Sequence, residues 1–170
     1  MYYRWLGALL IVTGCGGFGY TLTAEYKKQE ILLKALLQSI KTMQWELQYR
    51  LTPLPELCQM AGKQAGGKIG KVFCGAAKEM EQQLAPNAES CLLQAISREP
   101  HLPHSIRLLL KQLGISLGRY DLSGQLEGLE AVAAACHEEQ ESLQEGRQER
   151  FRSYRTLSIC AGAALAILFL

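Results

Sequence analysis

The charged residues of this chain are confined almost entirely to its middle. Outside the stretch from Glu25 to Arg155, the 170-residue sequence carries one charged side chain, Arg4. From Trp5 to Ala24 there are 20 consecutive uncharged residues, and from Thr156 to Leu170 there are 15. A helix of the first length crosses the hydrocarbon core of a bilayer, whereas one of the second length reaches about 22 Å. Both ends are therefore expected to be embedded in a membrane.

These ends divide the chain into an N-terminal transmembrane helix at 1–24, a helical domain at 25–155 and a C-terminal transmembrane helix at 156–170. Basic residues accumulate on the cytoplasmic side of membrane spans. Here they gather on the inner flank of both predicted spans, which places the middle domain in the cytoplasm. The residues concerned are Lys27, Lys28, Arg147, Arg150, Arg152 and Arg155.

The N-terminus has a second interpretation. Arg4, an apolar run and then Val12-Thr13-Gly14-Cys15 resemble a bacterial lipoprotein signal that ends in a lipid-bearing cysteine. This interpretation would make the protein a lipid-anchored helical interaction protein outside the cytoplasm. The apolar character continues past Cys15 through Phe18 and Leu22, which favours the membrane span instead.

Six cysteines are spread widely along the chain, with no Cys-x-x-Cys pair. Wide spacing on helical segments is typical of free, buried thiols in a reducing compartment. It disfavours both a disulfide framework and a zinc site. The cysteines are Cys15, Cys58, Cys74, Cys91, Cys136 and Cys160.

The sequence of the middle domain predicts helices and no strands. Proline and glycine separate segments whose apolar residues recur every three or four positions, and Thr52 is placed to cap the second helix. Because the connections are short, we expect an all-α antiparallel bundle of about six helices. The predicted helices cover Glu25–Leu51, a short stretch from Pro53 to Gly66-Gly67, Lys68–Leu84, Glu89–Arg98, Ser105–Leu113 and Asp121–Arg155, with a turn at Gly114–Gly118 before the last.

The first and last of these helices each carry one apolar face. The predicted core residues are Leu33, Leu36, Leu37, Ile40, Met43 and Leu47 on the first, and Leu122, Leu126, Leu129, Ala133, Cys136 and Leu143 on the last. Trp45 and Tyr49 lie on another side of the first helix. They form either a second buried face or an exposed patch.

The sequence offers little material for catalysis. It contains three histidines and one aspartate, and no nucleophile, base or metal ligands cluster along it. His101 and His104 flank a turn without further ligands. We expect no catalytic residue, cofactor, metal ion, nucleic acid or small-molecule substrate. A membrane-bound enzyme with an unrecognised site is the alternative.

Charge is unevenly distributed along the last helix. Between Glu127 and Glu149 there are seven glutamates and one basic residue, Arg147. An acidic helical face of this kind is typical of simple solvation, and it can also receive a basic partner. The arginines that follow are explained by membrane topology and anionic head groups.

Several motifs resemble the stage III sporulation protein AB family of endospore-forming bacteria over essentially the whole chain. They are the Cys15-Gly16-Gly17-Phe18-Gly19-Tyr20 end of the first span, Glu46-Leu47-Gln48-Tyr49 leading into Thr52-Pro53-Leu54-Pro55-Glu56-Leu57, Leu113 to Asp121 with Gln125, and Arg152-Ser153-Tyr154-Arg155. Tyr120 departs from the small residue expected before Asp121, which remains free to cap the last helix.

The resemblance implies a structural role. The family is similar to the cytoplasmic helical domain of the F component, the inner-membrane platform protein of type II secretion systems. The resemblance therefore implies that the chain is part of a platform in the channel between mother cell and forespore. The platform would lie in the outer forespore membrane, with its soluble domain facing the mother-cell cytoplasm, and would engage a cytoplasmic secretion ATPase and other membrane subunits. Within the motifs, the candidate partner-binding residues are Glu46, Glu56, Arg119 and Asp121.

Overall fold

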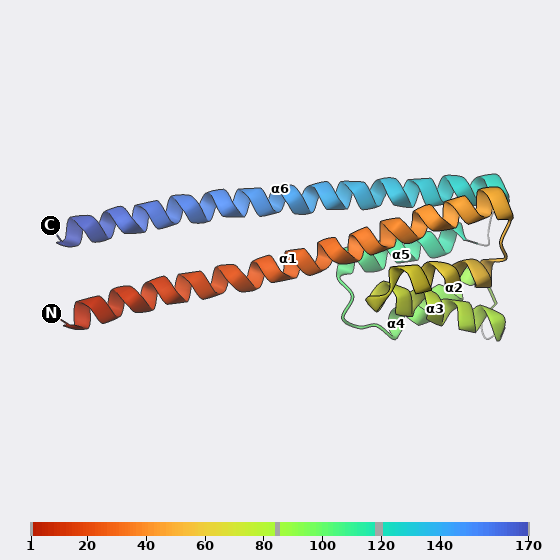
Figure 1. Cartoon of the computed structure of the whole chain (residues 1–170), viewed down its shortest axis with the longest axis horizontal. Coiled ribbons are helices and arrows are strands. Elements are labelled where there is room, and N and C mark those ends of the chain that lie inside the picture. The colour runs from red at the N-terminus through yellow and green to blue at the C-terminus, as the bar shows by residue number, and fades with distance from the viewer. Residues whose placement is uncertain (1, 84–85, 118–120, 170) are drawn as a thin grey trace. The chain divides into compact units, whose positions relative to one another are not determined.

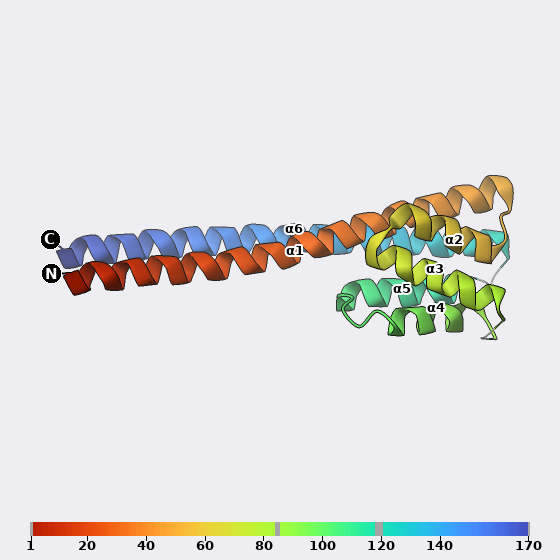
Figure 2. The same cartoon turned by 60° about the horizontal axis from the view of Figure 1, so that its bottom comes forward.

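The chain is all-helical wherever its structure, a computed structural model, describes the backbone, namely residues 2–83, 86–117 and 121–169. Side chains are described for residues 26–83, 86–117 and 121–146. The helices are α1 (Tyr2–Arg50), α2 (Leu54–Ala65), α3 (Gly67–Glu81), α4 (Ala88–Ser97), α5 (His104–Ser116) and α6 (Leu122–Phe169) (Figure 1). No strand occurs in the described ranges (Figure 2), which confirms the all-α class and the six helices; the two transmembrane helices of the same prediction are not shown by the structure.

The chain divides into two compact units. One comprises Met1–Lys28 and Glu141–Leu170, and the other is the bundle formed by Gln29–Gln140. The predicted membrane segments, 1–24 and 156–170, belong to the first unit, and their side chains lie outside the described part of the chain. In the part that is described, no helical segment is both long enough and apolar enough to cross a bilayer.

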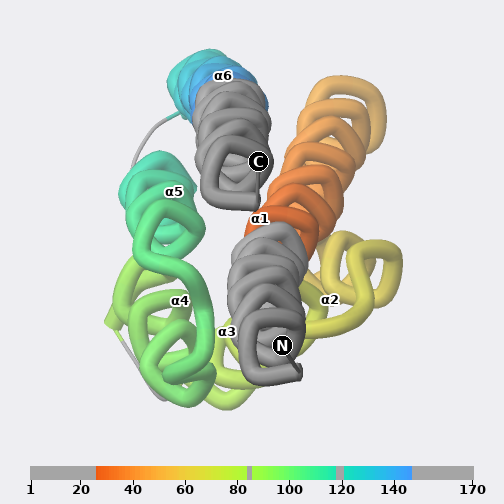
Figure 3. The backbone as a smooth tube through the Cα atoms, turned by 90° about the vertical axis from the view of Figure 1, so that its left-hand side faces the viewer, coloured from red at the N-terminus to blue at the C-terminus, as the bar shows by residue number. Residues whose placement is uncertain are grey.

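The bundle forms because each of its helices has an apolar face. On α1, Leu33, Leu36, Ile40, Met43 and Leu47 are buried as predicted, whereas Leu37 is half-buried. Viewed end-on, the helices follow one another around the core in sequence order (Figure 3). Ser39 links α1 to α2, because its hydroxyl donates to the carbonyl oxygen of Ala61 at 3.4 Å.

The α2–α3 hairpin is held together by a close helix contact. A Cβ atom on Gly62 would lie 2.9 Å from the backbone nitrogen of Cys74, and one on Gly70 would lie 2.5 Å from the carbonyl oxygen of Gly62. The turn uses positive φ angles at Gly66 and Gly67, a conformation that glycine adopts without steric cost. The predicted break at this glycine pair is therefore confirmed.

Two local predictions were wrong. Thr52 does not cap α2; the N-cap position is Pro53, without a side-chain hydrogen bond. Gly114 does not begin a turn, since α5 continues to Ser116. A Cβ on Gly114 would lie 3.2 Å from Cδ2 of Leu92, so this glycine serves close packing against α4.

The apolar seam of α6 is shorter than predicted. Leu129 and Cys136 are buried, and so is Val132, which the prediction omitted. Leu122 is exposed at the helix start, while the other predicted positions, Leu126, Ala133 and Leu143, are half-buried. The bundle therefore covers only the middle of the predicted seam.

Candidate partner-binding surface

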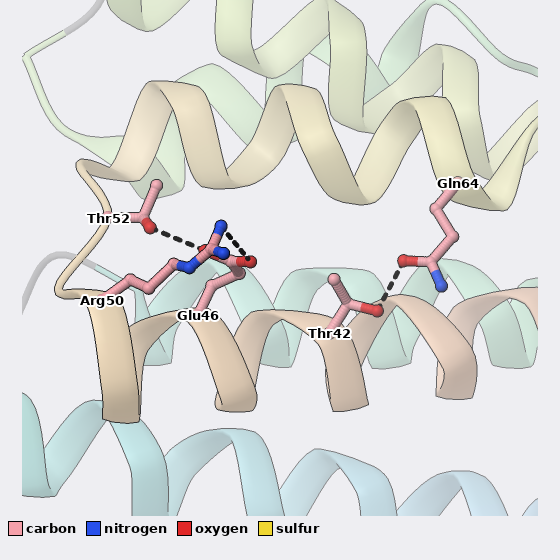
Figure 4. A network of polar contacts seen from close by, with 5 residues as sticks. All are labelled: Thr42, Glu46, Arg50, Thr52 and Gln64. Carbon is pink, nitrogen blue, oxygen red and sulfur yellow. Dashed lines mark hydrogen bonds and ion pairs between the residues drawn. The ribbon is translucent and has the colours of Figure 1, made fainter.

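Glu46 is the most enclosed of the four candidate residues. It is 4% exposed, and the hydroxyl of Thr52 donates to its Oε2 at 2.9 Å. Nη1 of Arg50 lies 3.6 Å from Oε1 (Figure 4). About one turn earlier, Thr42 donates to Oε1 of Gln64 across the α1–α2 contact at 2.5 Å. The described contacts of Glu46 thus hold the end of α1 to the segment that enters α2.

The other three candidates differ in their surroundings. Glu56 lies exposed in the first turn of α2, with no ion-pair partner among the described residues. Asp121 caps α6: its Oδ1 accepts from the backbone N–H of Gly124 at 3.1 Å, and its Oδ2 accepts from the Ser123 hydroxyl at 3.0 Å. Arg119 lies outside the described residues. Partner binding by all four stays a prediction.

Trp45 and Tyr49 form an exposed patch, which decides between the two interpretations of these residues. They are 50% and 67% exposed, and their ring centroids lie 5.6 Å apart. The guanidinium carbon of Arg50 stands 5.3 Å from the Trp45 ring centroid, within the range of a cation–π interaction. Leu51, just after α1, is also exposed and has a φ of 51°, a strained conformation for leucine. Exposed apolar surface of this kind marks contact sites.

An ion pair between a buried glutamate and an exposed arginine, which sequence reasoning missed, joins α3 to the end of α4. Glu79 is 1% exposed, and its Oε1 lies 2.7 Å from Nη2 of Arg98. Neither oxygen of Glu79 has a hydrogen-bond partner among the described residues, so the contact is an ion pair without good hydrogen-bond alignment. Nothing in the sequence distinguished Glu79 from the solvated glutamates around it.

The described cysteines are all free, as predicted; Cys58, Cys91 and Cys136 are buried and Cys74 is half-buried. Burial raises the pKa of the Cys58 thiol to about 12, and the neighbouring Cys91 and Cys74 add to the shift. Burial, and then Glu139, raises the pKa of the Cys136 thiol to about 11. Such thiols stay protonated and unreactive at neutral pH.

No metal centre is formed within the described ranges, where no group of three or more His, Cys, Asp or Glu side chains could hold an ion. His101 lies in the turn before α5 and His104 is the first residue of α5, and both are exposed. The backbone carbonyl of His101 accepts from Nζ of Lys68 at 2.9 Å. This contact ties the α4–α5 loop to α3 and is structural.

Comparison with known proteins decides the family. The stage III sporulation protein AB family matches residues 4–170. The chain belongs to this family. A relative of that name from Bacillus subtilis (strain 168) is 21% identical over 167 residues, which cover 97% of this chain and 98% of the relative.

The fold of the family is also found among solved structures. A solved stage III sporulation protein AB matches with a TM-score of 0.64 and 18% identity, over 72% of this chain and 98% of that one. At this identity the match shows the fold. The names of the family and of these relatives describe a sporulation protein and no enzymatic activity.

Proposed function

We propose that this member of the family is a structural membrane subunit, a platform in a secretion-like channel between mother cell and forespore. It is anchored in the outer forespore membrane with its bundle in the mother-cell cytoplasm. There the bundle docks a cytoplasmic secretion ATPase, and the anchors contact other membrane subunits. Family membership over residues 4–170 is the observation that carries this proposal.

The arrangement of α1 and α6 supports the anchoring. Each is a single helix that takes part in the bundle and also includes predicted membrane residues, Trp5–Ala24 in α1 and Thr156–Phe169 in α6. A helix without a break transmits load between its two ends better than a flexible tether does. A platform that bears an assembling machine benefits from such a connection.

Glu56 is the best residue for testing ATPase docking. Reversing its charge changes an exposed position, whereas reversal at Glu46 would place a cation in a buried network and disturb the fold. Glu81, exposed at the end of α3, provides a matched control. We expect Glu56→Lys to reduce ATPase recovery at least tenfold while Glu81→Lys leaves it unchanged.

The experiment is a pull-down from sporulating cells that express the full tagged chain in place of the native one, combined with a count of heat-resistant spores. We expect deletion of the chain to lower the spore count by orders of magnitude, and the Glu56→Lys variant to fall between deletion and wild type. A deletion strain that sporulates normally would contradict the channel role. Recovery of a mature chain beginning at a lipidated Cys15 would contradict the cytoplasmic placement.

A further inference from the structure

The exposed side of α1 in the bundle presents one continuous stripe. From Lys34 to Gln48 its members follow steps of three and four residues, and Tyr49 is four residues after Trp45, so they lie along one side of the helix. Arg50 starts about 140° further round the helix, but its guanidinium reaches back over the Trp45 ring. Two lysines come first, followed by the aromatic pair and Arg50. We call this stripe the basic–aromatic face; it comprises Lys34, Gln38, Lys41, Trp45, Gln48, Tyr49 and Arg50.

The two lysines of this face are available for a partner. Lys41 is exposed and has no carboxylate partner in the described part of the chain. Among the described side chains, Lys34 pairs only with Glu30, four residues away on the same helix, at 2.7 Å, and both side chains are partly in solvent. Exposed pairs of this kind are weak and exchange readily.

The exposed side of α6 in the same unit has the opposite charge. It carries Glu127, Glu130 and Glu138, with Ala131 and Ala134 between them, and all five are exposed. None of the three glutamates has a cationic partner among the described side chains. We call these five residues the acidic face.

The two faces match in spacing as well as in charge. Lys34 and Lys41 are about 10 Å apart along α1, and Glu130 and Glu138 are about 12 Å apart along α6. Two lysines of one helix can therefore meet two carboxylates of the other. The alanines leave room beside the carboxylates for a large ring such as that of Trp45.

We propose that the basic–aromatic face of one copy packs against the acidic face of a second copy. Both halves of the contact are on the same chain and in the same compact unit, which favours a second copy over an unrelated acidic protein. Two copies that exchange both contacts at once form a closed dimer, whereas a head-to-tail contact leaves one face of each kind free to continue the assembly. Such contacts build rings or open chains.

The two parts of the contact have different roles. Burial of the Trp45 and Tyr49 rings supplies most of the affinity, as aromatic anchors do at other interfaces. The lysine–glutamate pairs set the orientation and the association rate, and salt weakens them. This inference does not depend on the proposed channel or on ATPase docking.

Reversing one charge on each face, alone and in combination, tests the proposal. We would measure the mass of the full chain, in a mild non-ionic detergent, by sedimentation velocity over a range of concentrations. Wild type is expected to form dimers or larger assemblies. Lys41→Glu and Glu130→Lys, each alone, should weaken association at least tenfold, and an equimolar mixture should restore it. In the mixture, each interface between the two different variants joins opposite charges. Either Lys41 meets Glu130, as in wild type, or the introduced glutamate meets the introduced lysine.

Matched controls lie on other helices. Lys63→Glu on α2 and Glu81→Lys on α3 reverse exposed charges outside both faces and should leave association unchanged. Trp45→Ala should weaken association at least tenfold, and mixing should not restore it. A monomeric wild type, assembly that persists in Lys41→Glu, or a mixture that stays monomeric would each overturn the proposal. The spore count and the ATPase pull-down are independent of these outcomes.

Discussion

Thr52 donates a hydrogen bond to Glu46 across the connection between α1 and α2, with 2.9 Å between the hydroxyl and Oε2. Thr52→Val keeps the shape of the side chain and removes the donor. An almost buried carboxylate then loses a hydrogen bond, so we expect the free energy of unfolding to fall by about 1–2 kcal/mol. Urea denaturation of the full chain, followed by circular dichroism, measures this change.

Thr42→Val is the matched control. This hydroxyl also bonds across the α1–α2 contact, but its partner Gln64 is exposed and can bond to water instead. We expect a loss below about 0.5 kcal/mol. Equal losses in the two variants would show that burial of Glu46 does not strengthen its interaction with Thr52.

The ion pair between Glu79 and Arg98 gives a second prediction. Arg98→Met leaves the buried carboxylate of Glu79 without its cation. Removal of one partner from a fully buried pair costs roughly 3–5 kcal/mol. Because the Arg98 side chain is 63% exposed, solvent screens the charge, and we expect about 2 kcal/mol.

Lys71→Met is the control for Arg98→Met. Lys71 lies 3.9 Å from Glu99 and is largely exposed, so Lys71→Met should change the free energy of unfolding by less than about 0.5 kcal/mol. Both variants are measured by the same denaturation. The prediction fails if Arg98→Met is as stable as Lys71→Met.

Two glycine-to-alanine substitutions are expected to change stability in opposite directions. Gly62 lies in the close contact between α2 and α3, whereas Gly146 lies on α6 in open space. Gly62→Ala places a methyl group 2.9 Å from the backbone nitrogen of Cys74, which cannot move without shifting α3. We expect a loss of about 2 kcal/mol. Gly146→Ala on α6 has nothing within 4 Å, so the better helix propensity of alanine should raise stability by about 0.5–1 kcal/mol. Thermal denaturation of both variants gives the two signs.

The sequence predicted the helices well because proline, glycine pairs and apolar periodicity act locally. It placed the break at Gly66-Gly67 and most of the buried face of α1 correctly. Gly114 was misread as a turn because a glycine required for close packing looks the same in sequence as one required for a turn. That glycine contacts Leu92 on the preceding helix, 22 residues earlier in the sequence, and only the folded chain reveals the contact.

The candidate site was less predictable for a related reason. Glu46, Glu56 and Glu79 are all glutamates on helices, yet one is enclosed by a hydrogen-bond network, one is exposed and one is buried beside Arg98. Their differences depend on which neighbour each meets across the bundle. Trp45 and Tyr49 likewise had two open interpretations, because helical angles fix the side on which a residue lies but do not show what covers that side.

The raised pKa of Cys58 predicts how stability depends on pH. The thiol ionises near its ordinary value of 9.0 in the unfolded chain but only at about 12 in the folded chain. Its contribution to stability is therefore complete below pH 9 and is lost as the pH rises from 9 towards 12, at up to about 1.4 kcal/mol per pH unit. The pKa of the Cys136 thiol, about 11, also falls in this range. The measurement is therefore the difference between wild type and Cys58→Ala in urea denaturation from pH 8 to 11. The free energy of unfolding of wild type should fall more steeply than that of the variant, and parallel curves would show that Cys58 ionises equally easily in both states.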